Sequence, residues 1–417
     1  MATEDLFISV IIILVSARIL GEVAQRFHQP ALVGEILAGI ILGPSLLLIV
    51  VPNEDLVVLS ELAVFFLMFL AGLEMHPEEI KKAGKSAIVI SSLAFGLPLL
   101  GGVGISLLFQ LDIIQAMFMG LLLSITAVPV SAIVLMEFGI IRTRLGNAVI
   151  TAAVINDIFS LVILSIILQI NNISNPGQID YTAIGFSVIN IGSFIGGIFL
   201  IDLLFRKTSH WLPKKIAPLF SKMKTKEAAF GMLLITTITI SLIAQEAGLH
   251  FIIGTFFSGL IVYKQIIGKK NFDRVYGIVS AISFGFFAPI FFALIGIQFN
   301  AQSLLTAIPL FLSLLAVAII GKVGGGWLGA RLAKFNKEQS LSIGFLMNGR
   351  GMVELVIASI GFSSDILDVR LFSVAVAIGV ITTILAPVLA RSFIEKSKIK
   401  TKYPFLEESD NLKKNLN

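Results

Sequence analysis

The chain has 417 residues, of which 56% are hydrophobic and 14% are charged. A soluble domain is usually about 45–50% apolar and about 25% charged, and a single hydrophobic core stops growing at about 250–300 residues. The composition, with a mean hydropathy of +0.97, therefore excludes an ordinary soluble fold and indicates a membrane protein. The absence of cysteine also excludes a disulfide scaffold and cysteine-ligated metal sites.

Thirteen apolar segments approach the length of about 20 helical residues that crosses the hydrocarbon core of a bilayer. They are predicted at 6–25, 32–51, 57–74, 87–109, 114–136, 146–168, 183–205, 228–246, 248–263, 277–298, 304–330, 339–360 and 371–393. The first follows Glu4 and Asp5 rather than a basic stretch, so we interpret it as a retained span and not as a signal peptide. The sequence thus predicts an all-α polytopic membrane protein.

Lysine and arginine gather in every second loop between these segments. Cytoplasmic loops carry such an excess, whereas the opposite loops contain mainly acidic residues such as Asp55 and Asp112. The pattern predicts a cell-membrane protein with an extracellular N-terminus and a short cytoplasmic tail at 394–417. It also accounts for the net charge of +5, so no nucleic-acid partner is expected.

A glycine motif occurs in both halves of the chain. Gly34 and Gly39 of the second segment recur as Gly254 and Gly259 of the ninth. Segments one to six would then repeat as eight to thirteen, with 183–205 as a connector. Because equivalent segments are offset by seven spans, an odd number, the second half would be inverted. Inverted repeats of this kind are typical of secondary transporters, although similar glycines also occur where apolar helices simply pack closely.

The sharpest functional signal is Asp157, which lies beside Asn156 in the middle of the sixth segment. A charge at the bilayer centre costs at least about 2.5–3.5 kcal/mol, so such a residue is a functional candidate by default. This carboxylate can carry a proton, bind a cation, or do both in alternation, and Asn156 offers a neutral carbonyl ligand for a monovalent metal ion. The alternative is a structural hydrogen bond between helices.

Two segments carry residues that interrupt helices. In the fifth, Pro129 removes a backbone hydrogen bond and the hydroxyl of Thr126 can satisfy the freed groups. In the twelfth, two glycines flank Arg350. We expect two discontinuous helices that cross near the midplane and direct their ends toward Asp157. The alternative is a proline kink and an unrelated glycine pair.

Three further charged residues lie within spans. Lys322 needs a carboxylate partner at that depth, and Asp157 is the natural candidate, unless the lysine extends to the cytoplasmic surface. Arg350 and Glu354 are four residues apart on one helix face and can pair with each other. We interpret that pair as a structural or gating element rather than as the ion carrier.

These motifs, in this order, resemble the second branch of the cation:proton antiporter superfamily, which includes NapA-type sodium/proton antiporters and the membrane domain of Kef-type potassium effluxers. The matching stretches are 28–45, 66–74, the Asn156-Asp157 pair, Lys322 and 348–354. The resemblance implies exchange of protons for a small monovalent cation, with Na+ as the first choice and Li+ or K+ as alternatives. It assigns the bound cation to Asp157, with Asn156 and Thr126 beside it and Lys322 as the charge-compensating group.

The resemblance also implies an architecture. Residues 1–393 would form one exchanger domain of a homodimer that works by elevator-type alternating access. A dimerisation panel would come from 1–51 and 228–263, and a core bundle from 57–168 and 277–393. No enzymatic activity and no cofactor are expected.

Two departures leave the stoichiometry open. Electrogenic members of the superfamily usually have Asp-Asp where this chain has Asn156-Asp157. Electroneutral members have Asn-Asp together with a glutamate and an arginine at the positions of Ala152 and Lys322.

Other classes of function remain as alternatives. One is a Kef-like potassium efflux system or a channel-like pore gated by a separate partner. An intramembrane protease would need a second central aspartate besides Asp157, and an organic-anion symporter would need more cationic residues than Lys322 supplies.

Overall fold

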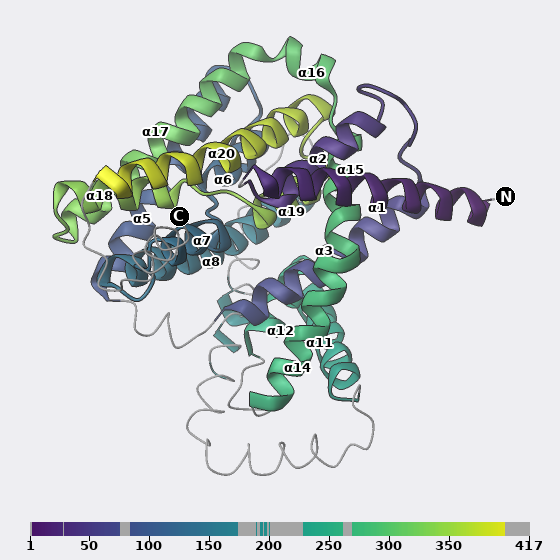
Figure 1. Cartoon of the computed structure of the whole chain (residues 1–417), viewed down its shortest axis with the longest axis horizontal. Helices are drawn as coiled ribbons and strands as arrows, with labels where there is room; N and C mark the ends of the chain where they lie inside the picture. Colours follow the sequence, from purple (N-terminus) through teal and green to yellow (C-terminus); the bar gives the residue numbers. More distant parts are fainter. Residues whose placement is uncertain are drawn as a thin grey trace, which may run out of the picture.

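The computed structural model describes residues 2–27, 29–75, 84–173, 228–261 and 269–396, together with isolated positions between 189 and 200. Every regular element in this part of the chain is a helix (Figure 1). In chain order these are α1 (Ala2–Arg26), α2 (Ala31–Leu42), α3 (Glu54–Glu74), α5 (Lys85–Leu108), α6 (Ile113–Ser124), α7 (Val128–Glu137), α8 (Arg144–Ile173), α11 (Ala228–Glu246), α12 (Phe251–Ile261), α14 (Lys269–Ile282), the π-helix η1 (Ser283–Phe287), α15 (Ala288–Gln298), α16 (Ala301–Thr306), α17 (Ile308–Leu332), α18 (Lys337–Met347), α19 (Met352–Ser363) and α20 (Val369–Lys396).

The helices agree with the predicted polytopic membrane fold. Eight of the described spans are long and apolar enough to cross a membrane, and the bent pair α18–α19 raises the number to nine. The helices α2, α11 and α12 are shorter but apolar. The predicted connector 183–205 lies mostly outside the described residues, as does the tail beyond Lys396, so the total of thirteen spans stays a prediction.

The second predicted segment is wrong at its C-terminal end, because α2 stops at Leu42 rather than at residue 51. Proline disfavours a helical residue before it and has no N–H to continue the ladder, so Pro44 ends the helix at Gly43. The glycine also contacts a neighbouring helix, since a Cβ atom on Gly43 would lie 2.8 Å from the Cα of Ile297.

The tenth predicted segment, 277–298, begins earlier than expected and is not a uniform α-helix. Helix α14 begins at Lys269 and continues through η1 into α15. Arg18 Nη2 donates hydrogen bonds to the carbonyl oxygens of Phe284 and Gly285 in η1, at 2.5 and 2.7 Å. A π-helix changes the backbone hydrogen-bond pattern locally, and Arg18 ties α1 to that irregular turn.

The described helices pack in two groups (Figure 1). In one, α5 packs against α17 and α6, and α18 packs against α17 and α20. In the other, α3 packs against α12, and α2 packs against α15 and α1. The third and tenth predicted segments therefore pack mainly with α12 and α2, and their assignment to a core bundle stays a prediction.

Glycines make two matching close contacts in the second group. A Cβ atom on Gly296 of α15 would lie 2.9 Å from the Cα of Gly39 on α2, and one on Gly259 of α12 would lie 2.9 Å from the Cα of Gly72 on α3. Real Cβ atoms essentially never come this close to a neighbouring backbone, so both helix pairs meet backbone to backbone. The contact of the second predicted segment (α2) with the tenth (α15) thus matches the contact of the ninth (α12) with the third (α3).

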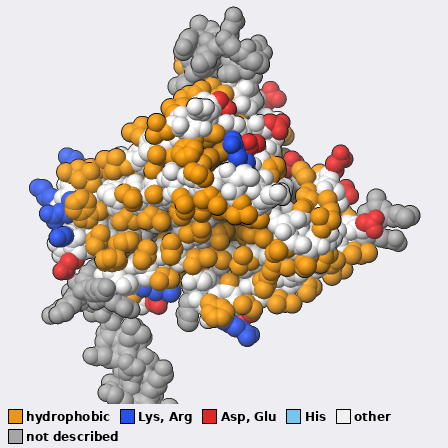
Figure 2. Space-filling model, turned by 90° about the horizontal axis from the view of Figure 1, so that it is seen from above, with side chains coloured by type: hydrophobic (Ala, Val, Ile, Leu, Met, Phe, Trp, Pro, Cys, Tyr) orange, Lys and Arg blue, Asp and Glu red, His pale blue; other side chains and the backbone are white. Residues whose placement is uncertain are grey.

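The outer surface is largely apolar, and charged side chains lie mostly at its margins in Figure 2. Large hydrophobic side chains that are 60–72% exposed include Phe7, Ile11, Leu100, Leu305 and Ile320. An apolar surface this extensive is unfavourable in water. It is suited to contact with lipid acyl chains.

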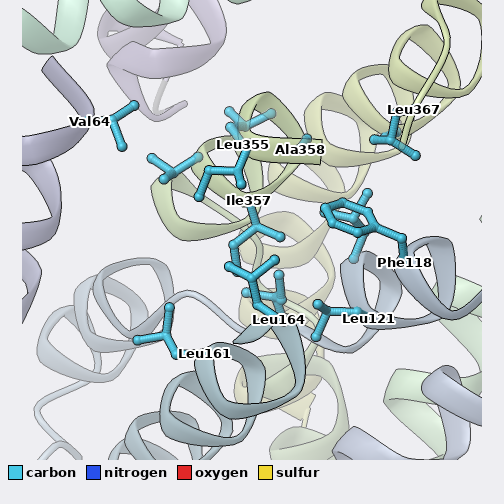
Figure 3. Close-up of a cluster of buried hydrophobic side chains, with 14 of the residues drawn as sticks. Val64, Phe118, Leu121, Leu161, Leu164, Leu355, Ile357, Ala358 and Leu367 are labelled. Atoms are coloured by element: carbon cyan, nitrogen blue, oxygen red, sulfur yellow. The ribbon is translucent and has the colours of Figure 1, made fainter. Parts of the chain in front are cut away.

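A buried apolar cluster lies between α6, α8 and α19 (Figure 3). Its members include Phe118 and Leu121 of α6, Leu161 and Leu164 of α8, Val64 of α3, and the α19 residues Leu355, Ile357 and Ala358. Each of the three helices carries a buried polar or charged residue within about one turn of this cluster, namely Ser124, Asp157 and Glu354. The cluster therefore borders a polar region.

Candidate functional site

The polar region is built around two helix breaks that cross. Short non-helical stretches separate α6 from α7 and α18 from α19, and the latter pair is bent by 42°. The Ala127 amide donates a hydrogen bond to the Gly349 carbonyl at 2.8 Å, and Thr126 Oγ1 donates to the Met347 carbonyl at 3.3 Å. The predicted crossing of two discontinuous helices is present.

Proline and glycine have separate roles in this crossing. Pro129 lies in the first turn of α7, where its missing N–H is not needed, so it begins a helix instead of kinking one. A Cβ atom on Gly351 would lie 2.8 Å from the Ala127 side chain, and one on Gly349 would lie 3.1 Å from that of Val130. The two glycines therefore let the α18–α19 break pass close to the α6–α7 break.

The C-terminal end of α6 is capped by two cationic side chains. Arg350 donates hydrogen bonds to the carbonyls of Leu122 and Leu123 at 2.9 and 2.7 Å, and Lys322 Nζ donates to the carbonyl of Ser124. The last carbonyls of a helix lack partners within it and carry partial negative charge. The two cations thus stabilise a helix end that is buried inside the protein.

Arg350 also forms the ion pair expected with Glu354. Its Nη1 lies 2.5 Å from Glu354 Oε1, and both side chains are almost completely buried. Glu354 is in the first turn of α19, where the helix dipole favours a negative charge. The pair therefore links the start of α19 to the end of α6.

Asn156 has both of its side-chain groups engaged by protein partners. Ser91 on α5 donates to Asn156 Oδ1, and Asn156 Nδ2 donates to Thr126 Oγ1 at 3.0 Å. Asn156 Oδ1 thus already accepts one hydrogen bond from the protein, and its expected role as a cation ligand stays a prediction. Asn156 joins α5 to the first helix break, and the two adjacent serines at 91 and 92 in an apolar span gave no indication of that contact.

Asp157 is buried, at 5% exposure, and its Oδ1 atom has no hydrogen-bond partner. The predicted ion pair with Lys322 is not formed, because the lysine donates to Ser124 instead. The two charges still lie close enough to interact electrostatically. No group of three His, Asp or Glu side chains converges in the described part of the chain, so Asp157 supplies one unpaired carboxylate suited to a proton or a monovalent cation.

Comparisons with known proteins agree with this geometry. The family model described as "Sodium/hydrogen exchanger, transmembrane" matches residues 10–395. The probable Na+/H+ antiporter GerT of Bacillus cereus is 30% identical over 378 residues, which cover 89% of this chain and 94% of that protein. A Na+/H+ antiporter of Enterococcus hirae is 29% identical over 385 residues, covering 92% and 97%.

The fold is also that of a solved antiporter. The sodium proton antiporter MjNhaP1 from Methanocaldococcus jannaschii superposes with a TM-score of 0.71 over 95% of this chain and 99% of that chain, at 17% sequence identity. The match of the family model over residues 10–395 and the 30% identity to GerT show that the chain belongs to the sodium/hydrogen exchanger family of the cation:proton antiporter superfamily.

Proposed function

We propose that the protein exchanges protons for Na+ across the cell membrane and that both ions bind in turn to Asp157. The observation that carries the proposal is the unpaired, buried Asp157 carboxylate beside the crossed helix breaks. Na+ is the first choice because the relatives from B. cereus and E. hirae are named Na+/H+ antiporters. Another B. cereus relative, GerN, is named a Na+/H+-K+ antiporter, which keeps K+ as an alternative.

Transport would proceed by alternating access in an inverted repeat of six plus six spans. The matching contacts of Gly39 with Gly296 and of Gly259 with Gly72 support the repeat, because exchanging the second span with the ninth and the third with the tenth turns one contact into the other. With the N-terminus outside, the apolar cluster of Figure 3 would lie on the extracellular side of Asp157. An elevator-type movement of the core would then expose Asp157 to the extracellular side of the membrane.

The protein would act as a homodimer. Helix α1 presents an exposed apolar stripe at four-residue spacing, formed by Phe7, Ile11, Val15 and Ile19, which are 53–66% exposed. Residues at this spacing lie on one helix face. The stripe supports the assignment of α1 to a dimerisation panel.

Competition between the two ions is the direct test of a shared site. The apparent KM for Na+ should rise as pH falls, because a protonated Asp157 cannot bind the cation, while the maximal rate at saturating Na+ should stay unchanged. Dye-monitored proton flux in vesicles, with Na+, Li+ and K+ added in turn over a series of pH values, measures both quantities. A KM that is independent of pH would mean that proton and cation bind at separate groups.

Lys322 decides whether the exchange carries charge. One carboxylate that exchanges one proton for one monovalent cation moves no net charge, whereas two protons move if Lys322 also releases its proton when the cation binds. We expect the electrogenic cycle, since Lys322 is fully buried and its Ser124 partner can accept a hydrogen bond from a neutral amine as well as from an ammonium. A potential of ~100 mV would then change the driving force by about 2.3 kcal/mol per charge.

Current recordings test this stoichiometry. Proteoliposomes on a solid-supported membrane should give a current after a Na+ concentration jump, and Lys322→Ala should abolish that current. Sodium-driven proton flux without any current in the unmodified protein would show a one-for-one cycle in which Lys322 serves to cap α6.

A further inference from the structure

The helix crossing contains many oxygen atoms, but most of them already accept a hydrogen bond. Cationic side chains bond the carbonyls of three consecutive residues at the end of α6, namely Leu122, Leu123 and Ser124. At the α18–α19 break, the carbonyls of Leu346, Met347 and Gly349 accept hydrogen bonds from residues 126–131. Ser91 occupies Asn156 Oδ1. Oxygen atoms that accept no hydrogen bond are the most readily available ligands for a cation that enters this region.

Asn348 provides such an atom. It is fully buried, and neither its Oδ1 nor its Nδ2 has a hydrogen-bond partner. Leaving a buried polar group unsatisfied costs about 1–3 kcal/mol, so an unpartnered amide in a native protein calls for an explanation. The α18–α19 break does not explain why this polar amide is present, because the side chain of Asn348 caps no helix end.

The position of Asn348 in the crossing is fixed by its neighbours. Met347 accepts a hydrogen bond from Thr126 Oγ1, and Gly349 accepts one from the Ala127 amide. Thr126 in turn accepts from Asn156, the residue that precedes Asp157. Two hydrogen bonds therefore connect the backbone of Met347, next to Asn348, with the side chain of Asn156, next to Asp157.

We propose that Asn348 is a ligand of the transported cation and that its amide oxygen supplies the neutral ligand expected of Asn156. The inference rests on the proposed antiport at Asp157 and adds a second ligand to it. Oxygen is the donor that hard cations prefer, and an amide oxygen binds a cation without taking up a proton at neutral pH. Asn348 therefore affects cation affinity and leaves proton binding at Asp157 unchanged.

The substitution Asn348→Ala tests this assignment. Loss of one ligand should raise the apparent KM for Na+ about tenfold, which corresponds to about 1.4 kcal/mol. The maximal rate at saturating Na+ and the pH dependence of proton release should stay close to those of the unmodified protein. Proton flux in proteoliposomes, with NaCl, LiCl or KCl as the added salt, gives these values.

A control variant separates a ligand from a merely buried polar residue. Ser106 of α5 is also fully buried with an unpartnered hydroxyl, and it lies outside both breaks. Ser106→Ala should leave the KM for Na+ unchanged. If both variants shift the KM equally, or neither does, the assignment of Asn348 is wrong.

A binding measurement gives a second readout that does not need transport. NaCl should raise the unfolding temperature of the detergent-solubilised protein, because a ligand that binds the native state stabilises it. Asn348→Ala and the milder Asn348→Ser should each need about ten times more NaCl for the same shift. If the Asn348 variants are stabilised at the same NaCl concentrations as the unmodified protein, the proposal is wrong. That result would leave antiport at Asp157 intact, because Asp157→Asn tests it separately.

Discussion

Asp157→Asn is expected to abolish cation-dependent proton flux while the protein remains folded. The substitution removes the carboxylate that would bind proton and cation in turn, and an amide binds neither a proton at neutral pH nor a cation with comparable strength. Because Asp157 Oδ1 has no hydrogen-bond partner, the isosteric amide breaks no hydrogen bond at that atom. We expect flux at the background of empty vesicles and an unfolding temperature no lower than that of the unmodified protein.

The measurement is dye-monitored proton flux in proteoliposomes, with Na+, Li+ and K+ tested separately, together with thermal unfolding in detergent. Asp112→Asn is a suitable control, because Asp112 caps the N-terminus of α6 and asparagine caps helices equally well. This variant should transport normally. Substantial flux from Asp157→Asn would remove Asp157 as the shared ion and proton site.

The local features of the site followed well from the sequence. The four-residue spacing of Arg350 and Glu354 predicted an ion pair, which is present at 2.5 Å, although Arg350 lies in the break before α19 and not on the helix itself. Pro129 and the glycines around Arg350 predicted where the two helices are interrupted. Such features depend on residues close together in the chain, so short-range sequence patterns are enough to predict them.

Contacts between distant segments were harder to predict. Lys322 bonds the Ser124 carbonyl rather than Asp157, and Asn156 bonds Ser91, because a buried polar group takes the partner that the packing brings nearest. The grouping of spans was uncertain for a related reason. Apolar faces look alike in sequence whether they contact lipid or another helix, so hydropathy gave no reason to place α3 against α12.

Among the proposed variants, Arg350→Met should cause the largest loss in the free energy of unfolding. Arg350 is one of the largest fully buried side chains, and its removal leaves Glu354 as an unpaired buried charge and the Leu122 and Leu123 carbonyls without their donors. Breaking a buried ion pair by removing one partner typically destabilises a protein by about 3–5 kcal/mol. We expect a loss of this size in the free energy of unfolding, measured by denaturant titration in detergent.

The double variant Arg350→Met with Glu354→Gln separates the two causes. Removing both charges together is often nearly neutral, since the isolated charge and not the missing pair is what destabilises the interior. The double variant should therefore regain part of the loss, and the remainder measures what the α6 carbonyls gain from the guanidinium. Strict additivity of the two single variants would mean that Glu354 is not coupled to Arg350. In that case the contribution of Arg350 to stability would lie in capping the buried end of α6, where its hydrogen bonds and the one from Lys322 hold three consecutive carbonyls.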